Sequence, residues 1–98
     1  MDEIIHQSLR LRIMASLNTL QPGAMLEFPR LRAMLEATDG NLGAHLTTLE
    51  KAGYIEMLKD FDGRKPRTRI AMTRLGRSAF AAHVAELRAL LAQSSAAE

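Results

Sequence analysis

Basic side chains are concentrated in one short part of the chain. Between Gly63 and Arg77 there are six of them and no acidic residue. They are Arg64, Lys65, Arg67, Arg69, Arg74 and Arg77. The formal net charge of the 98-residue chain is only +2, so the rest of the chain is net negative. Such a cluster is typical of a surface that binds a polyanion, although a solvated hairpin kept soluble by its charge has the same composition.

Groups that could catalyse a reaction or hold a metal are scattered. The three histidines, His6, His45 and His83, stand in no metal-binding or catalytic spacing such as H-E-x-x-H. The absence of cysteine excludes a disulfide framework, a thiolate zinc site and a cysteine nucleophile. No phosphate-binding glycine motif is present. We therefore expect no enzyme activity, no catalytic residue, no metal ion and no cofactor.

Hydrophobic spacing and turn residues predict the elements that position these side chains. Residues 2–20 contain no glycine or proline and are expected to form a helix, which Gln21-Pro22-Gly23 ends. A short strand is expected at residues 24–28. Proline at position 29 then suits the first turn of a helix over residues 29–37.

A further helix is expected directly after a tight turn. Thr38 or Asp39 can cap a helix over residues 41–52, and Gly53 closes it. Two helices of about three turns, joined by a short turn that contains glycine, form a helix-turn-helix pattern.

The remaining residues predict a hairpin and a long helix. Residues 54–61 are rich in strand formers, and Asp62-Gly63 begins a hairpin turn. In residues 67–72, Thr68, Ile70 and Met72 fall on one side and Arg67, Arg69 and Ala71 on the other, as in a half-buried strand with an arginine face. Thr73 can cap a final helix that ends near residue 93. The expected fold class is mainly α with a small β-hairpin (α+β).

Three segments carry a resemblance to a known family. They are Asn41-Leu42-x-x-His45-Leu46-x-x-Leu49-Glu50-x-x-Gly53-Tyr54-Ile55, Asp62-Gly63-Arg64-Lys65-Pro66-Arg67-Thr68 and Thr73-x-x-Gly76-Arg77-x-Ala79-Phe80. In this order they resemble winged helix-turn-helix regulators of the MarR and ArsR kind, and most of all the short stand-alone winged-helix DNA-binding domains. The resemblance implies a dimeric transcriptional regulator. Its helix 41–52 would enter the major groove of double-stranded DNA, and its hairpin over residues 54–72, the wing, would contact the flanking backbone or minor groove.

The side chains of the helix 41–52 suit this role. If the three leucines at positions 42, 46 and 49 face the core, the other side carries small or short polar side chains that fit a groove. The candidate recognition residues are Asn41, Ala44, His45, Thr47, Thr48 and Lys51. The alternative is an ordinary solvated face, which is usually richer in Glu and Lys. Gly43 departs from the family pattern, and close packing on the preceding helix or close approach to a phosphate could explain it.

Phosphate contacts are expected mainly from the wing. The candidates are Arg64, Lys65, Arg67 and Arg69. Arg30 and Arg32 could bind the DNA backbone, or they could simply be solvated. The hypothesis requires that the outer side of the helix 41–52 is uncovered and that neighbouring carboxylates do not neutralise the arginines.

Apolar residues on more than one side of two helices predict a partner subunit. We expect one domain over residues 1–98 that forms a homodimer through the helices 2–20 and 73–93. Six methionines would suit a cleft for a small-molecule effector, but they are also ordinary core residues. The rival hypothesis is a winged helix that binds another protein, because a fold does not determine a function.

The sequence also predicts where the protein works. No stretch approaches the ~20 apolar residues that span a bilayer. The acidic start Met1-Asp2-Glu3 does not look like a secretory signal. Together with the absence of cysteine, this leads us to expect a cytoplasmic protein without a membrane partner.

Overall fold

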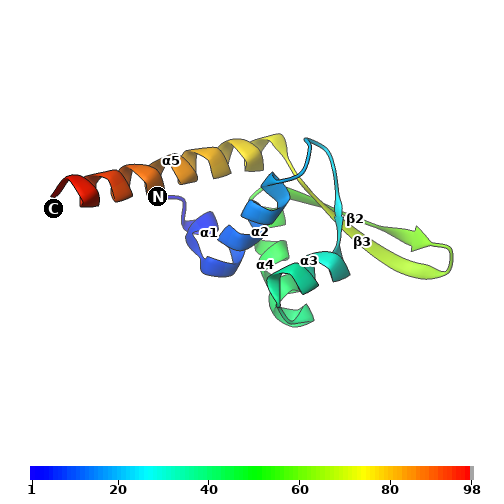
Figure 1. Cartoon of the computed structure of the whole chain (residues 1–98). Coiled ribbons are helices and arrows are strands. Elements are labelled where there is room, and N and C mark those ends of the chain that lie inside the picture. Colours follow the sequence, from blue (N-terminus) through cyan, green and yellow to red (C-terminus); the bar gives the residue numbers. More distant parts are fainter. Residues whose placement is uncertain (98) are drawn as a thin grey trace.

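The computed structural model describes residues 1–97, which form five helices and a three-stranded sheet (Figure 1). The elements are α1 (Glu3–His6), α2 (Ser8–Asn18), β1 (Leu26–Glu27), α3 (Phe28–Leu35), α4 (Asp39–Lys51), β2 (Ile55–Asp62), β3 (Lys65–Met72) and α5 (Arg74–Ala97). The β2–β3 hairpin and the long helix α5 extend to opposite sides of the cluster of shorter helices (Figure 1). The predicted fold class, mainly α with a small β-hairpin, is confirmed. Within residues 1–97, no helix combines the length and the apolar character that a bilayer crossing requires.

The helix predicted over residues 2–20 is interrupted at Gln7, so this prediction is wrong in detail. Gln7 has an extended backbone (φ −64°, ψ 134°), and its side-chain oxygen accepts a hydrogen bond of 2.8 Å from the N–H of Arg10. Asp2 caps α1 in the same way and accepts from two N–H groups of its first turn. These caps satisfy N–H groups that have no partner inside a helix, so the chain can turn between α1 and α2 without leaving them unpaired.

The helices α3 and α4 form the predicted helix-turn-helix. α3 ends at Leu35 because Glu36 adopts the left-handed conformation, with a φ of 51°. α4 begins at Asp39, two residues before the predicted start, and its cap is Thr38, whose hydroxyl oxygen accepts from the N–H of Asn41 at 3.2 Å. Gly53, with a φ of 81°, follows α4 as predicted.

The sheet has the strand order β1-β3-β2, and both pairs are antiparallel. A two-residue turn at Gly63 and Arg64 joins β2 to β3. Gly63 has a φ of 66°, the positive value that a type II′ turn requires at its first central position. This turn fixes the register of the hairpin and sets Phe61 opposite Pro66. β3 begins at Lys65, two residues before the predicted strand.

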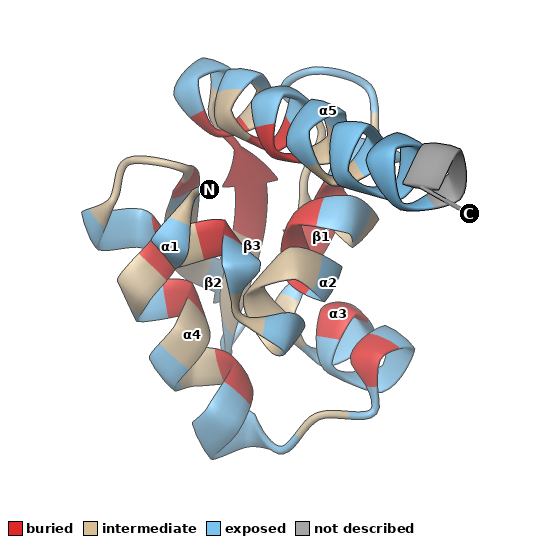
Figure 2. Ribbon diagram, turned by 90° about the vertical axis from the view of Figure 1, so that its left-hand side faces the viewer, coloured by how far each residue is buried: buried red, intermediate tan, exposed pale blue. Residues whose placement is uncertain are grey.

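The core lies where the helices pack on the inner end of the sheet. α4 contributes its three leucines at positions 42, 46 and 49, all with no exposed surface. They join a cluster that includes Ile13, Met14, Leu17, Leu31, Leu35, Ile55 and Ile70. The buried residues form the inward sides of the helices (Figure 2). The outer side of α4 is thereby left for contacts with other molecules.

The helix α5 is anchored at its first turn. The Thr73 hydroxyl donates a hydrogen bond of 2.6 Å to the carbonyl oxygen of Gly53 and accepts one of 2.9 Å from the N–H of Gly76, so Thr73 caps α5 as predicted. Gly76 lies against the backbone of Tyr54 and leaves no room for a Cβ atom. The helix continues to Ala97, four residues beyond the predicted end, and its outer half is largely exposed (Figure 2).

Candidate nucleic-acid interface

The outer side of α4 is open to solvent within the part of the chain that the structure describes. Asn41, Ala44, Thr47 and Lys51 are exposed, and Thr48 is half-buried. The Thr47 hydroxyl donates to the carbonyl oxygen of Gly43 at 3.0 Å, and the Thr48 hydroxyl donates to that of Ala44 at 3.3 Å. Each hydroxyl oxygen still has lone pairs that can accept a hydrogen bond. The face therefore presents small side chains, one amide, one ammonium and two threonine acceptors.

His45 differs from the other candidate recognition residues because another helix holds it. It is half-buried, and its Nδ1 lies 2.9 Å from Nη1 of Arg10 on α2. A guanidinium group can only donate, so Nδ1 must accept and the ring proton resides on Nε2. Arg10 also donates to the carbonyl oxygen of Ile4. Sequence reasoning missed Arg10, which links α1, α2 and α4 and leaves His45 only its Nε2 side for another molecule.

Gly43 is not explained by packing inside the chain. A Cβ atom at this position would have no neighbour within 4 Å. Close packing on the preceding helix, one of the two explanations considered from the sequence, is therefore wrong. Close approach to a phosphate stays a prediction.

The wing contains a carboxylate that sequence reasoning did not connect with its arginines. Asp60 on β2 accepts two hydrogen bonds of 2.9 Å from Nε and Nη2 of Arg67, and a third of 2.9 Å from Nη2 of Arg69. We call these three side chains the Asp60 clamp. The two arginines alone would carry a charge of +2, and with Asp60 the clamp carries a net charge of +1. The expectation that no carboxylate neutralises the wing arginines is therefore wrong for this pair.

The clamp also affects proton binding by its members. Hydrogen bonding from Arg67 outweighs desolvation and, with the charges of Arg67 and Arg69, holds the pKa of Asp60 below its ordinary value. The same carboxylate raises the pKa of Arg67. Asp60 and Arg67 therefore both stay charged at neutral pH.

The other basic residues between Gly63 and Arg77 lie in different environments. The side chains of Arg64 and Lys65, at the tip of the wing, are exposed and have no ion pair or hydrogen bond with any described residue. Arg77 instead bonds to the region after α2, with 3.3 Å to the Asn18 side chain and 3.5 Å to the Leu20 carbonyl oxygen. The six basic residues of the sequence therefore do not form one patch. Of the six, Arg64 and Lys65 at the tip of the wing and the exposed Arg74 at the start of α5 have no ion pair with a described residue.

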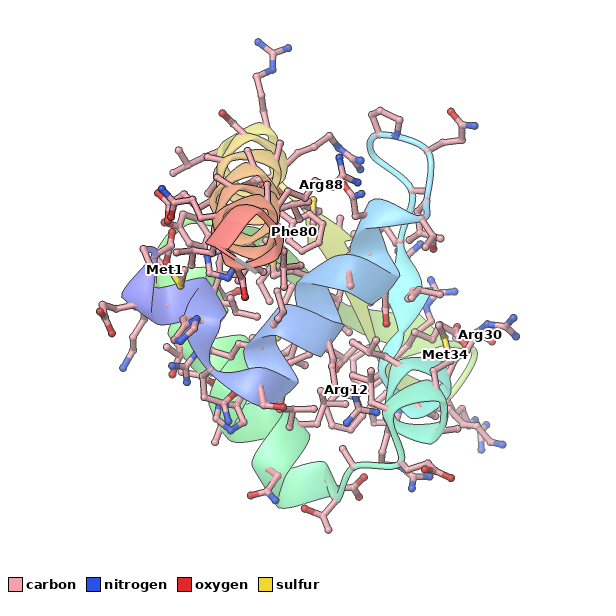
Figure 3. The ribbon with its side chains drawn as sticks, turned by 60° about the vertical axis from the view of Figure 1, so that its left-hand side comes forward. Met1, Arg12, Arg30, Met34, Phe80 and Arg88 are labelled. Carbon is pink, nitrogen blue, oxygen red and sulfur yellow. The ribbon has the colours of Figure 1, made fainter. Side chains whose placement is uncertain are left out.

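The two candidate arginines of α3 also differ. Arg32 pairs with Asp39 at the start of α4, with 3.0 Å between Nε and Oδ1, and both side chains are exposed. Such exposed pairs contribute little, so a phosphate can replace Asp39. Arg30 projects away from α3 into solvent (Figure 3). Arg12, which sequence reasoning missed, lies between α2 and α3 and donates to the carbonyl oxygen of Leu35 at 3.1 Å (Figure 3).

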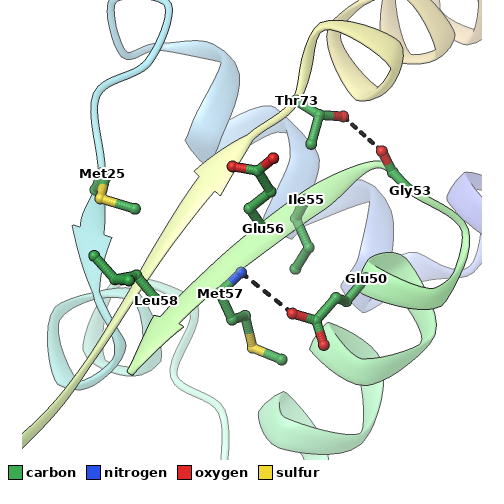
Figure 4. Close-up of a pocket in the computed structure, with 8 residues that line it drawn as sticks. All are labelled: Met25, Glu50, Gly53, Ile55, Glu56, Met57, Leu58 and Thr73. Atoms are coloured by element: carbon green, nitrogen blue, oxygen red, sulfur yellow. Dashed lines mark hydrogen bonds between the residues drawn. The ribbon is translucent and has the colours of Figure 1, made fainter. Parts of the chain in front are cut away.

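A hydrogen bond between α4 and the sheet helps to position the wing. The carboxylate of Glu50, in the last turn of α4, accepts from the N–H of Met57 on the outer edge of β2 at 3.3 Å (Figure 4). The adjoining hollow is lined by Met25, Glu50, Gly53, Ile55, Glu56, Met57, Leu58 and Thr73. Because this bond joins α4 to the base of the hairpin, the two candidate DNA-contacting elements are connected directly as well as through the core.

Comparisons with known proteins agree with this geometry. A family model described as a winged helix DNA-binding domain matches residues 9–91. An uncharacterized protein of Methanocaldococcus jannaschii is 35% identical over 85 residues, which are 87% of this chain and 89% of that protein. A solved structure of a transcriptional regulator homologue protein from Pyrococcus horikoshii OT3 superposes with a TM-score of 0.85. It is 27% identical, and the match covers 94% of this chain and 88% of that chain.

Proposed function

The chain belongs to the family of winged helix DNA-binding domains, and from this premise we propose that it is a dimeric transcriptional regulator that reads duplex DNA with α4. In this proposal α4 lies in the major groove and the β2–β3 wing contacts the flanking backbone or minor groove. The observation that carries the proposal is the outer side of α4. It is uncovered, and its side chains are short enough to enter a groove about 12 Å wide.

The chemistry of this side favours contact with bases over ordinary solvation. The Asn41 amide can pair with an adenine edge, and Thr47 and Thr48 can accept a hydrogen bond or contact a thymine methyl group. Lys51, in the last turn, can reach a phosphate or a guanine. Of the arginines and the lysine proposed to bind phosphate from α3 and the wing, Arg30, Arg64 and Lys65 have no carboxylate partner among the described residues. Arg32, Arg67 and Arg69 share theirs with a carboxylate.

The proposed dimer would use α5 together with α1 and α2. α5 is 24 residues long, and its outer half exposes Leu90 and Leu91, which are 51% and 68% exposed. A helix that carries leucines beyond the core gains stability when a second copy covers them. Two copies related by a two-fold axis would place two α4 helices on half-sites about one helical turn apart.

Light scattering at micromolar concentration tests the dimer. We expect twice the mass of one chain, and we expect a double variant Leu90→Asp/Leu91→Asp to shift toward the monomer. The control variant Gln21→Ala changes an exposed loop side chain and should leave the mass unchanged. A wild-type protein with the mass of one chain would contradict the dimer.

Fluorescence anisotropy with a random-sequence duplex at several salt concentrations tests DNA binding. Affinity should fall steeply with salt, by about one unit of log–log slope for each phosphate contact. Salt-independent binding, or none, would favour the rival in which the winged helix binds a protein. Binding that appears only after a small molecule is added would favour the effector hypothesis.

Selection of bound fragments from a random library tests the orientation of α4. The variants Asn41→Ala and Thr48→Ala should change the selected sequences, because bidentate or methyl contacts discriminate between bases. Gln21→Ala again serves as the control. Unchanged selection with both variants would show that another side of α4, or another element, reads the bases.

A further inference from the structure

The tip of the wing carries an exposed apolar pair. Phe61 is 68% exposed, whereas the other phenylalanine and tyrosine rings of the described residues are half-buried or buried. Directly opposite it on β3 stands Pro66, which is also exposed. We call Phe61 and Pro66 the tip pair. An exposed aromatic ring at the end of a projecting hairpin has no role in the core of this chain and is free to contact another molecule.

The register of the hairpin separates the tip pair from the Asp60 clamp. Directly opposed residues of an antiparallel pair share a face, and successive residues alternate between faces. Phe61 and Pro66 therefore lie on the face that continues inward to Met57 and Ile70, whereas the clamp lies on the other face. The arginines consequently do not cover the ring, and the ring does not take part in their pairing.

The surroundings of the tip pair identify the chemistry of its partner. Arg64, in the turn, and Lys65, next to Pro66 in the chain but on the face of the clamp, flank it at the tip, and neither side chain has an ion pair with a described residue. A hairpin tip with an apolar ring on one face and free cations in the turn and on the other face matches a polyanion whose phosphates flank an apolar, stacked interior. It matches an apolar protein groove less well, because both cations would have to be desolvated there.

The hairpin is also stiff at this point. Gly63 forms a tight two-residue turn, the ring of Pro66 fixes its own φ, and the clamp crosslinks β2 and β3 one pair further in. A stiff hairpin loses little conformational entropy when its tip is bound, so a single ring can contribute measurably to affinity.

We propose that Phe61, supported by Pro66, is an apolar wedge that contacts the bases in the minor groove next to the site of α4, while Arg64 and Lys65 bind the phosphates beside it. Apolar side chains, including Phe and Pro, act in this way in proteins that bind the minor groove. The inference depends on the proposed function, since it assumes that the chain binds duplex DNA. It adds a residue whose contact with DNA is independent of charge.

Salt titration of duplex binding distinguishes the wedge from a phosphate contact. Phe61→Ala should weaken binding to a random-sequence duplex about tenfold, because the loss of one aromatic–base contact has this magnitude. It should leave the log–log salt slope unchanged, because an apolar contact releases no counterions. Lys65→Ala should instead reduce the slope by about one unit. Leu58→Ala is the matched control, since Leu58 is 43% exposed on the same strand but lies on the opposite face, and it should change neither quantity.

The outcomes separate failure of the wedge from failure of the proposed function. Unchanged affinity of Phe61→Ala, or a loss accompanied by a lower slope as for Lys65→Ala, would overturn the wedge and leave DNA binding in place. Absence of salt-dependent binding by the wild-type protein would overturn the proposed function itself. Phe61→Thr is measured alongside, because its β-branched side chain suits a strand, so the same loss in both variants reports the missing ring and not a weakened hairpin.

Discussion

Substitution of Asp60 tests how the wing balances its charges. The carboxylate accepts three hydrogen bonds of 2.9 Å from Arg67 and Arg69, and it faces no other cation among the described residues at such a distance. Asp60→Asn keeps the size of the side chain but removes the negative charge. The net charge of the three side chains then changes from +1 to +2, and both guanidinium groups become available to DNA.

The size of the expected effect follows from this count. One additional phosphate contact steepens the log–log dependence of affinity on salt by about 0.9 units. Between 50 and 200 mM salt, the affinity of Asp60→Asn for a random duplex should therefore fall about three- to fourfold more than that of the wild-type protein. At the lower salt concentration the variant should bind more tightly than the wild type.

Anisotropy titrations at four or more salt concentrations measure both quantities. Asp62→Asn is the control, since it removes a carboxylate of the same strand that makes no hydrogen bond or ion pair with a described residue. It should change the slope less than Asp60→Asn does. The reasoning is refuted if the two variants steepen the slope equally, because total charge alone would then explain the result. It is also refuted if Asp60→Asn binds more weakly, because the clamp would then orient the arginines for DNA.

Three further predictions concern stability and are measured by urea unfolding. Gly76→Ala should lower the free energy of unfolding by about 2–3 kcal/mol, because a Cβ atom would collide with the backbone of Tyr54. Asp2→Ala should lower it by about 1–2 kcal/mol at pH 7, because Asp2 caps α1 and accepts a hydrogen bond of 2.6 Å from the Tyr54 hydroxyl. Burial tends to raise the pKa of Asp2, but the bonds from Tyr54 and the backbone outweigh it and hold this pKa below the ordinary 3.8. The charge-dependent part of the difference from wild type should therefore be full above pH 3.8 and be lost as the pH falls through the lower folded value. His83→Leu should raise the free energy of unfolding by about 1 kcal/mol, because His83 is 1% exposed and neither ring nitrogen has a partner among the described residues; a loss of stability would show that its nitrogens are satisfied.

The parts of the fold that were predictable depend on local chemistry. Thr38 and Thr73 cap helices with their own hydroxyl groups, and Gly53 and Gly63 supply the positive φ angles at which α4 ends and the hairpin turns. These effects involve residues only a few positions apart, so the sequence contains the whole interaction. The predicted helix-turn-helix and hairpin follow from them.

The break at Gln7 could not be predicted in this way. No glycine or proline marks it, and the segment on its N-terminal side is held by distant partners. Asp2 is bonded to Tyr54, 52 positions away, and Arg10 joins Ile4 to the ring of His45, which lies 35 positions further along the chain. Local propensity favours one continuous helix over residues 2–20, and tertiary contacts override it.

The candidate site shows the same division between local and distant effects. The leucine spacing of α4 correctly predicted which side is buried, because helical periodicity is local. The partners of Arg32 and His45 come from neighbouring elements, Asp39 and Arg10, and no pattern within α3 or α4 indicates them. Exposure of a recognition residue was therefore predictable, whereas its hydrogen-bond partner was not.

The net charge of the wing could have been predicted from the sequence, but the basic residues were counted along β3 alone, without the carboxylate that faces them on β2. A two-residue turn at Gly63 and Arg64 fixes the pairing of every residue beyond it, so Asp60 must face Arg67. Pairing across the hairpin removes one positive charge near the middle of the strands and leaves Arg64 and Lys65 uncommitted beside the tip pair. The basic residues of β3, counted alone, predict an attraction for phosphate along the whole strand. Pairing instead concentrates it at the tip, where the free cations and the exposed Phe61 ring lie together, and it is there that we expect substitutions in the wing to affect DNA binding most.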